Sequence, residues 1–306
     1  MQSRSMALVD AFTTDPLSGN AAGVIPDAEG LSDAQCHAIA RELAVSETAF
    51  VSPSADADRR IRYFTPTQEV DLCGHATIAA HAFLHEQGHL SAGRHSLETA
   101  VGALEVEIQD DGTVWMTQTP PTVVRQAIGY DRLADALGCA ASTLQDVGAD
   151  IPVARASTGL PVLVVPINFL ESLGGLDPDF GAIEALSAEY DVAGIYAFTF
   201  DTLSGDGTAH GRFFAPAVGV DEDPVTGTAS GACAAYFRTA GSAAFDDLDD
   251  DLVFEQGDLL DRAGRVRVRL DSDGGSTRVR VGGQAVTAVE GSITVPDEEA
   301  DDIIEA

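Results

Sequence analysis

The chain has 306 residues, 45% of them hydrophobic, and it carries 49 acidic against 17 basic side chains, for a net charge of −32. This length and hydrophobic content supply two medium-sized cores, which excludes a largely disordered chain. The negative field argues against nucleic acid as a partner, because no basic patch can form within it. The sequence contains no Lys, so a Schiff-base Lys and a P-loop nucleotide site are excluded.

The charge and the N-terminal segment predict the protein's environment. The acidity is typical of a halophilic protein, whose carboxylate surface stays solvated while salt screens its self-repulsion. Residues 1–5 are polar, no apolar core of a signal peptide follows them, and no apolar run reaches membrane-spanning length. We therefore expect a cytoplasmic protein without a membrane partner.

The cysteines predict neither a metal site nor a disulfide framework. They are Cys36, Cys73, Cys139 and Cys233, which lie far apart and form no CxxC pair. We expect no metal here.

The first half of the chain predicts several strands and two helices. Ser32 is placed to cap the first helix, and an Ala-rich run predicts a second, buried helix. The expected helices cover residues 33–44 and 75–87, and the expected strands cover residues 6–12, 46–51, 59–64, 95–99, 103–108 and 114–118. Residues 13–20 are expected to form a loop, and Pro120 and Pro121 end this half.

The second half repeats this pattern. Its helices are expected at residues 131–137, 180–190 and 228–239, the last of them Ala-rich. Its strands are expected at residues 153–156, 162–165, 194–200, 209–214, 252–255, 265–270, 278–281 and 285–295. The chain lacks regular β–α alternation, and no GxGxxG follows a strand. The pattern predicts an α+β fold of two pseudo-symmetric lobes, residues 1–121 and 122–306, each a curled sheet around a central helix.

Two segments open the Ala-rich helices in the same way. They are residues 71–77 (DLCGHAT) and residues 223–229 (DPVTGTA). A Gly turn at a helix N-terminus leaves backbone N–H groups pointing outward at the positive end of the helix dipole. Such a turn suits an anion, for example a substrate carboxylate, so two of them indicate a binding site shared by the two lobes.

The order and spacing of ten short motifs resemble the phenazine-biosynthesis isomerase (PhzF-like) family, which shares its fold with diaminopimelate epimerase. The motifs are residues 9–12 (VDAF), 18–21 (SGNA), 39–42 (IARE), 46–50 (SETAF), 62–66 (RYFTP), 71–77, 212–216 (RFFAP), 222–229 (EDPVTGTA), 256–257 (QG) and 281–283 (VGG). The resemblance covers nearly the whole chain. It implies isomerase chemistry without a metal or organic cofactor, a site in the cleft between the two lobes, and a homodimer.

The resemblance assigns the catalytic roles to Glu47, His75 and Asp223. Glu47 matches the family's acid/base, and its apolar neighbours predict a raised pKa; a salt-bridged or exposed Glu is the alternative. His75 begins a helix, where the dipole favours a neutral imidazole; a His that caps or is buried by hydrogen bonds is the alternative. Asp223 precedes a helix, where an Asp is commonly an N-terminal cap, and a cap can also orient a substrate.

Backbone N–H groups and short hydroxyls near the Gly turns are candidates to bind a substrate carboxylate. These residues are Gly19, Asn20, Gly74, Thr226, Gly227 and Thr228. Arg155 and Arg212 are possible carboxylate partners. Purely structural turn glycines are the alternative.

Two other functions stay open. An amino-acid racemase or epimerase could use the Cys73 thiol, but residues 223–226 offer no second Cys, and a small packed Cys73 is the alternative. A non-catalytic small-molecule binding protein could keep the same fold. His81, His85 and His89 are four residues apart on one helix face, which is predicted to be a solvated or half-buried stripe rather than a metal site.

Overall fold

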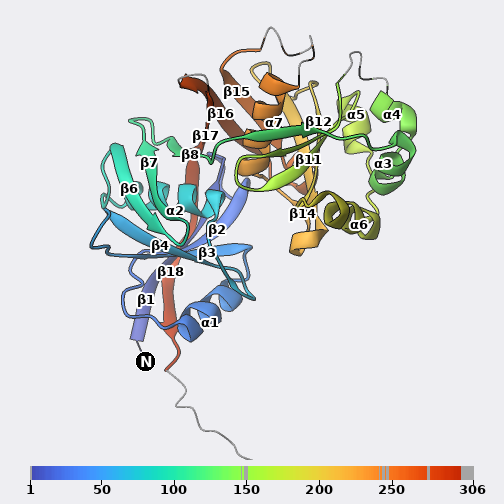
Figure 1. Cartoon of the computed structure of the whole chain (residues 1–306). Helices are drawn as coiled ribbons and strands as arrows, with labels where there is room; N and C mark the ends of the chain where they lie inside the picture. Colours follow the sequence, from blue (N-terminus) through green and yellow to red (C-terminus); the bar gives the residue numbers. More distant parts are fainter. Residues whose placement is uncertain are drawn as a thin grey trace, which may run out of the picture. The chain divides into compact units, whose positions relative to one another are not determined.

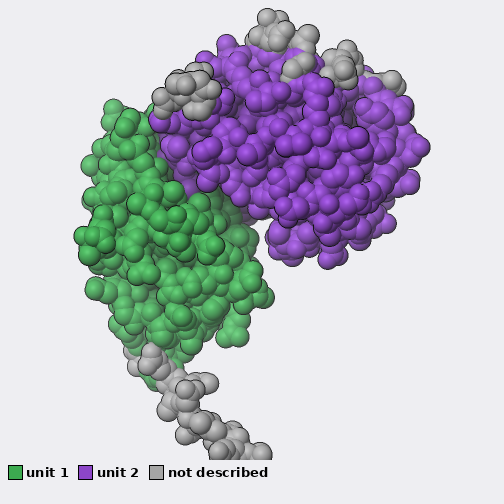
Figure 2. Space-filling model, viewed as in Figure 1, with its two compact units in different colours: residues 1–17, 21–114, 284–306 green, residues 18–20, 115–283 purple. Residues whose placement is uncertain are grey.

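The computed structural model describes residues 2–145, 147, 151–240, 242, 245, 248–273 and 276–297. The chain forms two compact units, shown in green and purple in Figure 2. Unit 1 comprises residues 1–17, 21–114 and 284–306, and unit 2 comprises residues 18–20 and 115–283. The units differ from the expected halves 1–121 and 122–306 in three places: residues 18–20 and 115–121 belong to unit 2, and residues 284–306 belong to unit 1. Residues 285–295 return to unit 1 because they pair antiparallel with the first strand along its whole length.

Unit 1 is a sheet wrapped around one helix. Its elements are β1 (Gln2–Ala11), β2 (Asn20–Ile25), α1 (Asp33–Leu43), β3 (Glu47–Ser52), β4 (Arg59–Phe64), β5 (Glu69–Val70), α2 (Gly74–Glu86), β6 (Gly93–Thr99), β7 (Gly102–Ile108) and β18 (Ala285–Val295). Helix α2 packs against β1, β3, β7 and β18, so strands surround it (Figure 1). Helix α1 lies outside this sheet and buries Cys36, Ile39 and Ala40 against Phe50 and Phe64.

Unit 2 has the same plan with more helices. Its elements are β8 (Val114–Thr117), β9 (Thr122–Arg125), α3 (Tyr130–Leu137), α4 (Ala141–Gln145), β10 (Ala154–Ser157), β11 (Pro161–Pro166), α5 (Leu170–Gly174), α6 (Phe180–Tyr190), β12 (Gly194–Thr199), β13 (Ala209–Ala215), η1 (Pro216–Val218), β14 (Val220–Asp223), α7 (Gly227–Thr239), β15 (Asp251–Gln256), η3 (Asp258–Leu260), β16 (Gly264–Asp273) and β17 (Ser276–Gly283). Helix α7 packs against strands β9, β10, β11, β16 and β17. Helices α3 to α6 form a second apolar core on the outside of the sheet.

The strand pairing repeats from one unit to the other. In unit 1, β2 and β3 are parallel, β3 and β4 antiparallel, β4 and β6 parallel, and β6 and β7 antiparallel. In unit 2, the same sequence of pairings joins β11 to β12, β12 to β13, β13 to β15, and β15 to β16. The first parallel pair of each unit, β2 with β3 and β11 with β12, is bridged by a helix, α1 or α6, that ends in a left-handed residue, Ala44 or Asp191. The predicted α+β fold of two similar lobes is confirmed.

One ion pair occupies the same place in both units. In unit 1, Arg62 of β4 bonds Glu69 of β5 at 2.7 Å and lies over the Phe64 ring. In unit 2, Arg212 of β13 bonds Glu222 of β14 at 2.8 Å and lies over the Phe214 ring. The motifs RYF and RFF therefore supply the same pair of contacts in each unit, an ion pair to the next strand and a cation–π contact with the Phe ring.

The predicted helices at 33–44, 75–87, 131–137, 180–190 and 228–239 appear as α1, α2, α3, α6 and α7. Strand β2 and the short elements β5, β9, β14, α4 and α5 were not predicted, because each is short or lies beside turn residues. Ser32 caps α1 in a capping box with Gln35, as predicted. Across the described residues, no helix combines the length and apolar character needed to cross a membrane.

Candidate active site

The starts of β3 and α2 bring three chemically active side chains together in unit 1. Glu47 is the first residue of β3, which is held in register by β2 on one side and β4 on the other. Cys73 is the N-cap of α2, and Gly74 and His75 begin the helix. One donor atom from each of Glu47, Cys73 and His75 lies within 4.8 Å of the other two.

His75 lies between the other two side chains of this cluster. Its Nε2 is 3.4 Å from Glu47 Oε2 and 3.3 Å from Ser46 Oγ, and its Nδ1 is 3.4 Å from Cys73 Sγ. One imidazole therefore connects a carboxylate, a hydroxyl and a thiol. An N–H on Nε2 can donate to Glu47 and hold the orientation of its carboxylate.

The cluster is accessible to small solutes. The Glu47 side chain is 23% exposed and that of His75 11%, while Cys73 is buried. Within α2, the hydroxyl and amide of Thr77 bond to the carbonyl of Cys73 at 2.6 and 3.0 Å, and the thiol makes no cap hydrogen bond. The first-turn amides beside Gly74 have no partner within the helix, so they are donors at the positive end of its dipole.

A second polar cluster surrounds the start of α7 in unit 2. Asp223 accepts one hydrogen bond from the Asn20 amide at 2.9 Å and another from the Thr226 hydroxyl. Gln256 donates to the Asp223 carbonyl at 2.7 Å and accepts from the Thr226 amide at 3.1 Å. Asn20 donates also to the carbonyl of Val225 at 2.9 Å. This network holds the Asp223 carboxylate in one orientation.

The loop that carries Asn20 is fastened by Arg262. The guanidinium donates to the carbonyls of Ser18 at 2.7 Å and Gly19 at 2.8 Å, and the Gly19 amide bonds to Ala263 at 3.0 Å. Gly257, with φ +91°, makes the turn into this segment, and a Cβ there would meet the carbonyl of Pro224 at 2.7 Å. Arg262 thus positions residues 18–20, which belong to the same unit.

The structure groups the expected residues into two sets. Glu47, Gly74 and His75 lie together in unit 1. In unit 2 the set lies at the entrance to α7 and on the loop bonded to it, and it comprises Gly19, Asn20, Asp223, Thr226, Gly227 and Thr228. Ser46, Gln256 and Arg262 belong to these sets and were not singled out as site residues. The QG motif at residues 256–257 was the one signal that pointed to Gln256.

Two expectations about cationic and imidazole side chains are corrected. Arg155 bonds to the carbonyl and carboxylate of Asp191, and Arg212 pairs with Glu222 and with two backbone carbonyls, so protein groups occupy both guanidinium groups. His81 is 1% exposed, where a solvated or half-buried side chain was expected, because α2 is enclosed by strands; His85 is partly buried and His89 exposed. Burial lowers the pKa of His81 to about 4.

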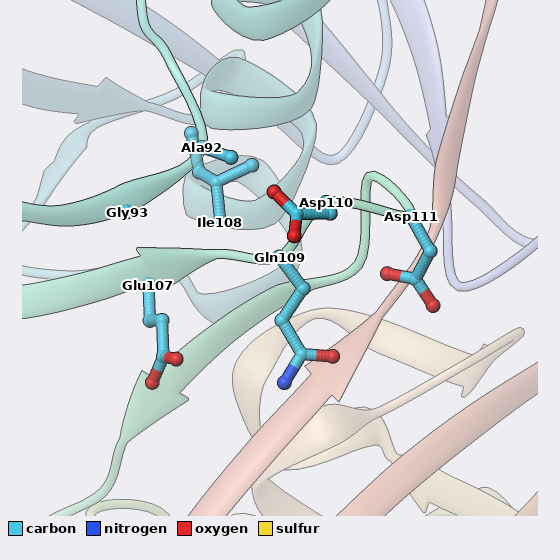
Figure 3. Close-up of a pocket in the computed structure, with 7 residues that line it drawn as sticks. All are labelled: Ala92, Gly93, Glu107, Ile108, Gln109, Asp110 and Asp111. Carbon is cyan, nitrogen blue, oxygen red and sulfur yellow. The ribbon is translucent and has the colours of Figure 1, made fainter.

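Unit 1 also contains a hollow, shown in Figure 3. Its volume is about 570 Å³, and none of its lining residues belongs to the sets above. The acidic side chains of Glu107, Asp110 and Asp111 line it together with Gln109. Three carboxylates repel an anion, so this hollow does not suit a carboxylate substrate.

The comparisons with known proteins define the class of this chain. The family model described as phenazine biosynthesis-like protein matches residues 9–291. The uncharacterized isomerase YfhB of Bacillus subtilis is 36% identical over 291 residues, covering 94% of this chain and 97% of that protein. The fold and these matches define an isomerase with an epimerase-like fold. The chain belongs to the phenazine biosynthesis-like (PhzF) family.

Solved structures agree with this assignment. The phenazine biosynthesis protein of the PhzF family from Bacillus anthracis superimposes with a TM-score of 0.88 at 32% identity, covering 96% of this chain and all of that one. A hydroxyproline epimerase from Agrobacterium vitis, solved with bound trans-4-hydroxy-L-proline, matches with a TM-score of 0.60 at 16% identity, over 96% of this chain and 91% of that one. At that identity, the second likeness shows the fold alone.

Proposed function

We propose that the chain is a cofactor-independent isomerase that moves a proton within a small carboxylate-bearing substrate, with Glu47 as the acid/base. The observation that carries this proposal is the pairing of Glu47 with His75 at 3.4 Å in a partly exposed position. A carboxylate that is oriented by an imidazole and reachable by solutes has the geometry that a general base needs.

The reaction is a proton transfer in two steps. The Glu47 carboxylate takes a proton from one substrate carbon, and the C–H electron pair delocalises into the neighbouring π system. The carboxylic acid then returns the proton to another carbon, which restores Glu47. His75 positions Glu47, and N–H groups near Gly74 bind negative charge on the substrate.

Unit 2 supplies binding groups in this proposal. Asp223 is an oriented acceptor for a substrate amine or hydroxyl, and the amides of Gly227 and Thr228 with the Thr228 hydroxyl bind a carboxylate. The Thr226 amide and hydroxyl already donate to Gln256 and Asp223, so Thr226 orients Asp223 instead. The network of Asn20, Gln256 and Thr226 supports this role, because it keeps the Asp223 carboxylate in place. We retain the homodimer as part of the proposal; light scattering in concentrated salt tests it.

A racemase with two thiols is less well supported. Cys73 lies 3.4 Å from the His75 imidazole, which favours reactivity of this thiol. The N-cap of α7, the counterpart of Cys73, is Thr226, and its hydroxyl donates to Asp223. A thiol on one side alone cannot carry out two-thiol proton exchange.

The test follows deuterium uptake at carbon by NMR, in D₂O with concentrated KCl. The substrate panel holds dihydro-hydroxyanthranilate, proline, hydroxyproline and diaminopimelate. We expect uptake or isomerisation with one of them, and a loss of about 10²–10⁴-fold in Glu47→Gln. Glu42→Gln, an exposed carboxylate of α1, is the matched control and keeps full activity.

Three outcomes contradict the proposal in different ways. Full turnover in Glu47→Gln removes Glu47 from the reaction. Uptake at an amino-acid α-carbon that disappears in Cys73→Ser makes the protein a racemase or epimerase. Binding without any proton exchange makes it a small-molecule binding protein.

A further inference from the structure

The cluster at the start of α2 has a ligand set that the proton transfer does not use as a whole. It combines a thiol, an imidazole and a carboxylate, from Cys73, His75 and Glu47. Zinc is held in proteins by these same three groups, and three protein ligands with one open position are typical of exchangeable or catalytic zinc. Cobalt(II) accepts the same donors, whereas magnesium and calcium prefer oxygen ligands alone.

One of the three donor–donor distances matches a tetrahedral ion, and the other two are longer. With zinc bonds of about 2.0–2.3 Å, the edges of the ligand tetrahedron are about 3.3–3.6 Å. His75 Nε2 lies 3.4 Å from Glu47 Oε2 and 3.9 Å from Cys73 Sγ. The remaining donor pair is within 4.8 Å. Small side-chain rotations therefore bring all three donors to bonding distance of a common centre.

The position also suits an ion that arrives from solution. Glu47 and His75 are partly exposed, so an ion reaches the donors without unfolding of the helix. Cys73 is the N-cap but makes no side-chain cap bond, so metal binding costs no capping hydrogen bond. Ser46 Oγ lies 3.3 Å from His75 Nε2, so a hydroxyl is also near the donor set.

We infer that Glu47, Cys73 and His75 form an inhibitory site for zinc or a similar thiophilic divalent cation. A carboxylate that coordinates the ion cannot take a proton from carbon, so occupancy stops the proposed isomerisation. Because Cys73 supplies the sulfur ligand, it is the residue that makes the proposed isomerisation sensitive to thiophilic metals. The inhibition rests on the proposed function, whereas the binding itself does not.

The acidic surface sets the design of the test, because its many carboxylates also attract divalent cations. A thiolate–cobalt(II) charge-transfer absorption reports only binding that includes a sulfur ligand. Cobalt(II) is titrated into the full chain in concentrated sodium sulfate, with excess magnesium to occupy surface carboxylates. Zinc is then added in competition, and no substrate is needed.

We expect the absorption band at one equivalent of cobalt(II) and its loss on addition of zinc. Cys73→Ser abolishes the band, and His75→Gln and Glu47→Gln weaken binding by at least about tenfold. Cys139→Ser is the matched control, because Cys139 is the partly exposed cysteine in unit 2. It keeps the band.

Absence of the band, or a band that survives in Cys73→Ser and disappears in Cys139→Ser, overturns the inference. Either result leaves the proposed isomerase reaction standing, because that reaction is measured separately by deuterium uptake. Turnover that is unaffected by zinc while the band forms overturns the inhibitory role alone. The Cys73→Ser variant is also tested for zinc binding by calorimetry, once an unchanged far-UV spectrum shows that it folds. Zinc binding that persists in this variant assigns the ion to surface carboxylates and contradicts the inferred site.

Discussion

Helices α2 and α7 are built alike, but their entrances carry different chemistry. Each has 13 residues and an N-cap whose side chain makes no cap hydrogen bond. In each, a hydroxyl one turn later donates to the N-cap carbonyl: Thr77 to Cys73 at 2.6 Å, and Ser230 to Thr226 at 3.0 Å. The two helix starts therefore share one hydrogen-bond arrangement, from a side-chain hydroxyl to the N-cap carbonyl.

A buried tyrosine supports that device in both units. The Tyr63 hydroxyl lies 2.6 Å from Thr77 Oγ1, and the Tyr196 hydroxyl lies 3.3 Å from Ser230 Oγ. Tyr63 comes from β4 and Tyr196 from β12, which corresponds to β3 of unit 1. A tyrosine hydroxyl thus contacts each helix start, and it comes from a different one of two neighbouring strands in each unit.

The difference lies in the titratable groups. Glu47 begins β3, and the equivalent first residue of β12 is Gly194. The N-cap thiol of Cys73 corresponds to the Thr226 hydroxyl. One entrance carries a thiol, an imidazole and a carboxylate, and the other an oriented, hydrogen-bonded Asp223. In the proposed function, the titratable groups of unit 1 carry the proton chemistry, and Asp223 of unit 2 is a binding group.

The strongest test of this asymmetry is Gly194→Ala. A Cβ at Gly194 would overlap the carbonyl oxygen of Phe214 and approach the Ala215 Cα at 2.8 Å. Because backbone cannot move aside cheaply, we expect a loss of about 4 kcal/mol or more in unfolding free energy. Gly129→Ala, at an open position of the same unit, is the control. Denaturation followed by Trp115 fluorescence reports unit 2; equal stability of the two variants would show that β12 has room for a side chain like that of Glu47.

The paired arginines give the next largest effect. Arg212 and Glu222 have side chains 11% and 14% exposed, whereas Arg62 and Glu69 are 27% and 39% exposed. Arg212→Gln leaves a buried carboxylate unpaired and is expected to cost about 3 kcal/mol. Arg62→Gln, the matched change, is expected to cost about 1 kcal/mol, because water solvates Glu69. Hydrogen exchange of β13 and β4 measures both, and equal losses would contradict the difference in burial.

We expect acid to destabilise unit 1 through His81. The equivalent position in helix α7 of unit 2 is Ala234, which does not titrate. Burial lowers the pKa of His81 to about 4. The unfolded chain, with an imidazole pKa near 6.5, takes up the proton first, so stability is complete above about pH 6.5 and declines as the pH falls toward 4. The loss is roughly 2–3 kcal/mol.

Hydrogen exchange of α2 amides at pH 7 and 4.5 measures this decline. His81→Gln should reduce it, since the amide can still donate to the Thr77 carbonyl, which lies 2.8 Å from His81 Nδ1. His89→Gln, at an exposed position of the chain, should leave it unchanged. An identical pH dependence in His81→Gln would remove this histidine as the cause.

The parts of the site that sequence predicted are those with a local pattern. The Gly turns and Ala-rich runs at residues 71–77 and 223–229 define both helix starts, because a small-residue helix suits burial on all sides. His81 is buried because strands enclose the small-residue helix on all sides. The four-residue spacing of the histidines shows only that their side chains share a face, and it does not show whether that face is buried. The spacing of the cysteines did not predict the cluster of Cys73, His75 and Glu47. Glu47 is distant from the other two in sequence, and only the pairing of β3 within the sheet brings it next to them.

Other contacts have no local signal at all. Arg262 bonds to the carbonyl of Gly19 across 243 positions of sequence, and Gln256 bonds to the backbone around Thr226 across 30. Each is a single polar residue in a loop or at a strand end. Their roles exist only once the sheet has brought the chain segments together. Arg212 was considered as a substrate ligand because its partner on the next strand, Glu222, could not be assigned from composition.

The most direct test of the division of labour compares Glu47→Gln with Asp223→Asn in the deuterium assay, at rising substrate concentration. Asp221→Asn, an exposed residue of the same strand β14, is the control for Asp223. The account predicts that Glu47→Gln takes up no deuterium at any concentration. It predicts that Asp223→Asn needs about 10–100-fold more substrate but then approaches the normal rate, since a charged hydrogen bond to the substrate is lost. Proton exchange that persists in Glu47→Gln and is absent from Asp223→Asn at saturation would contradict it.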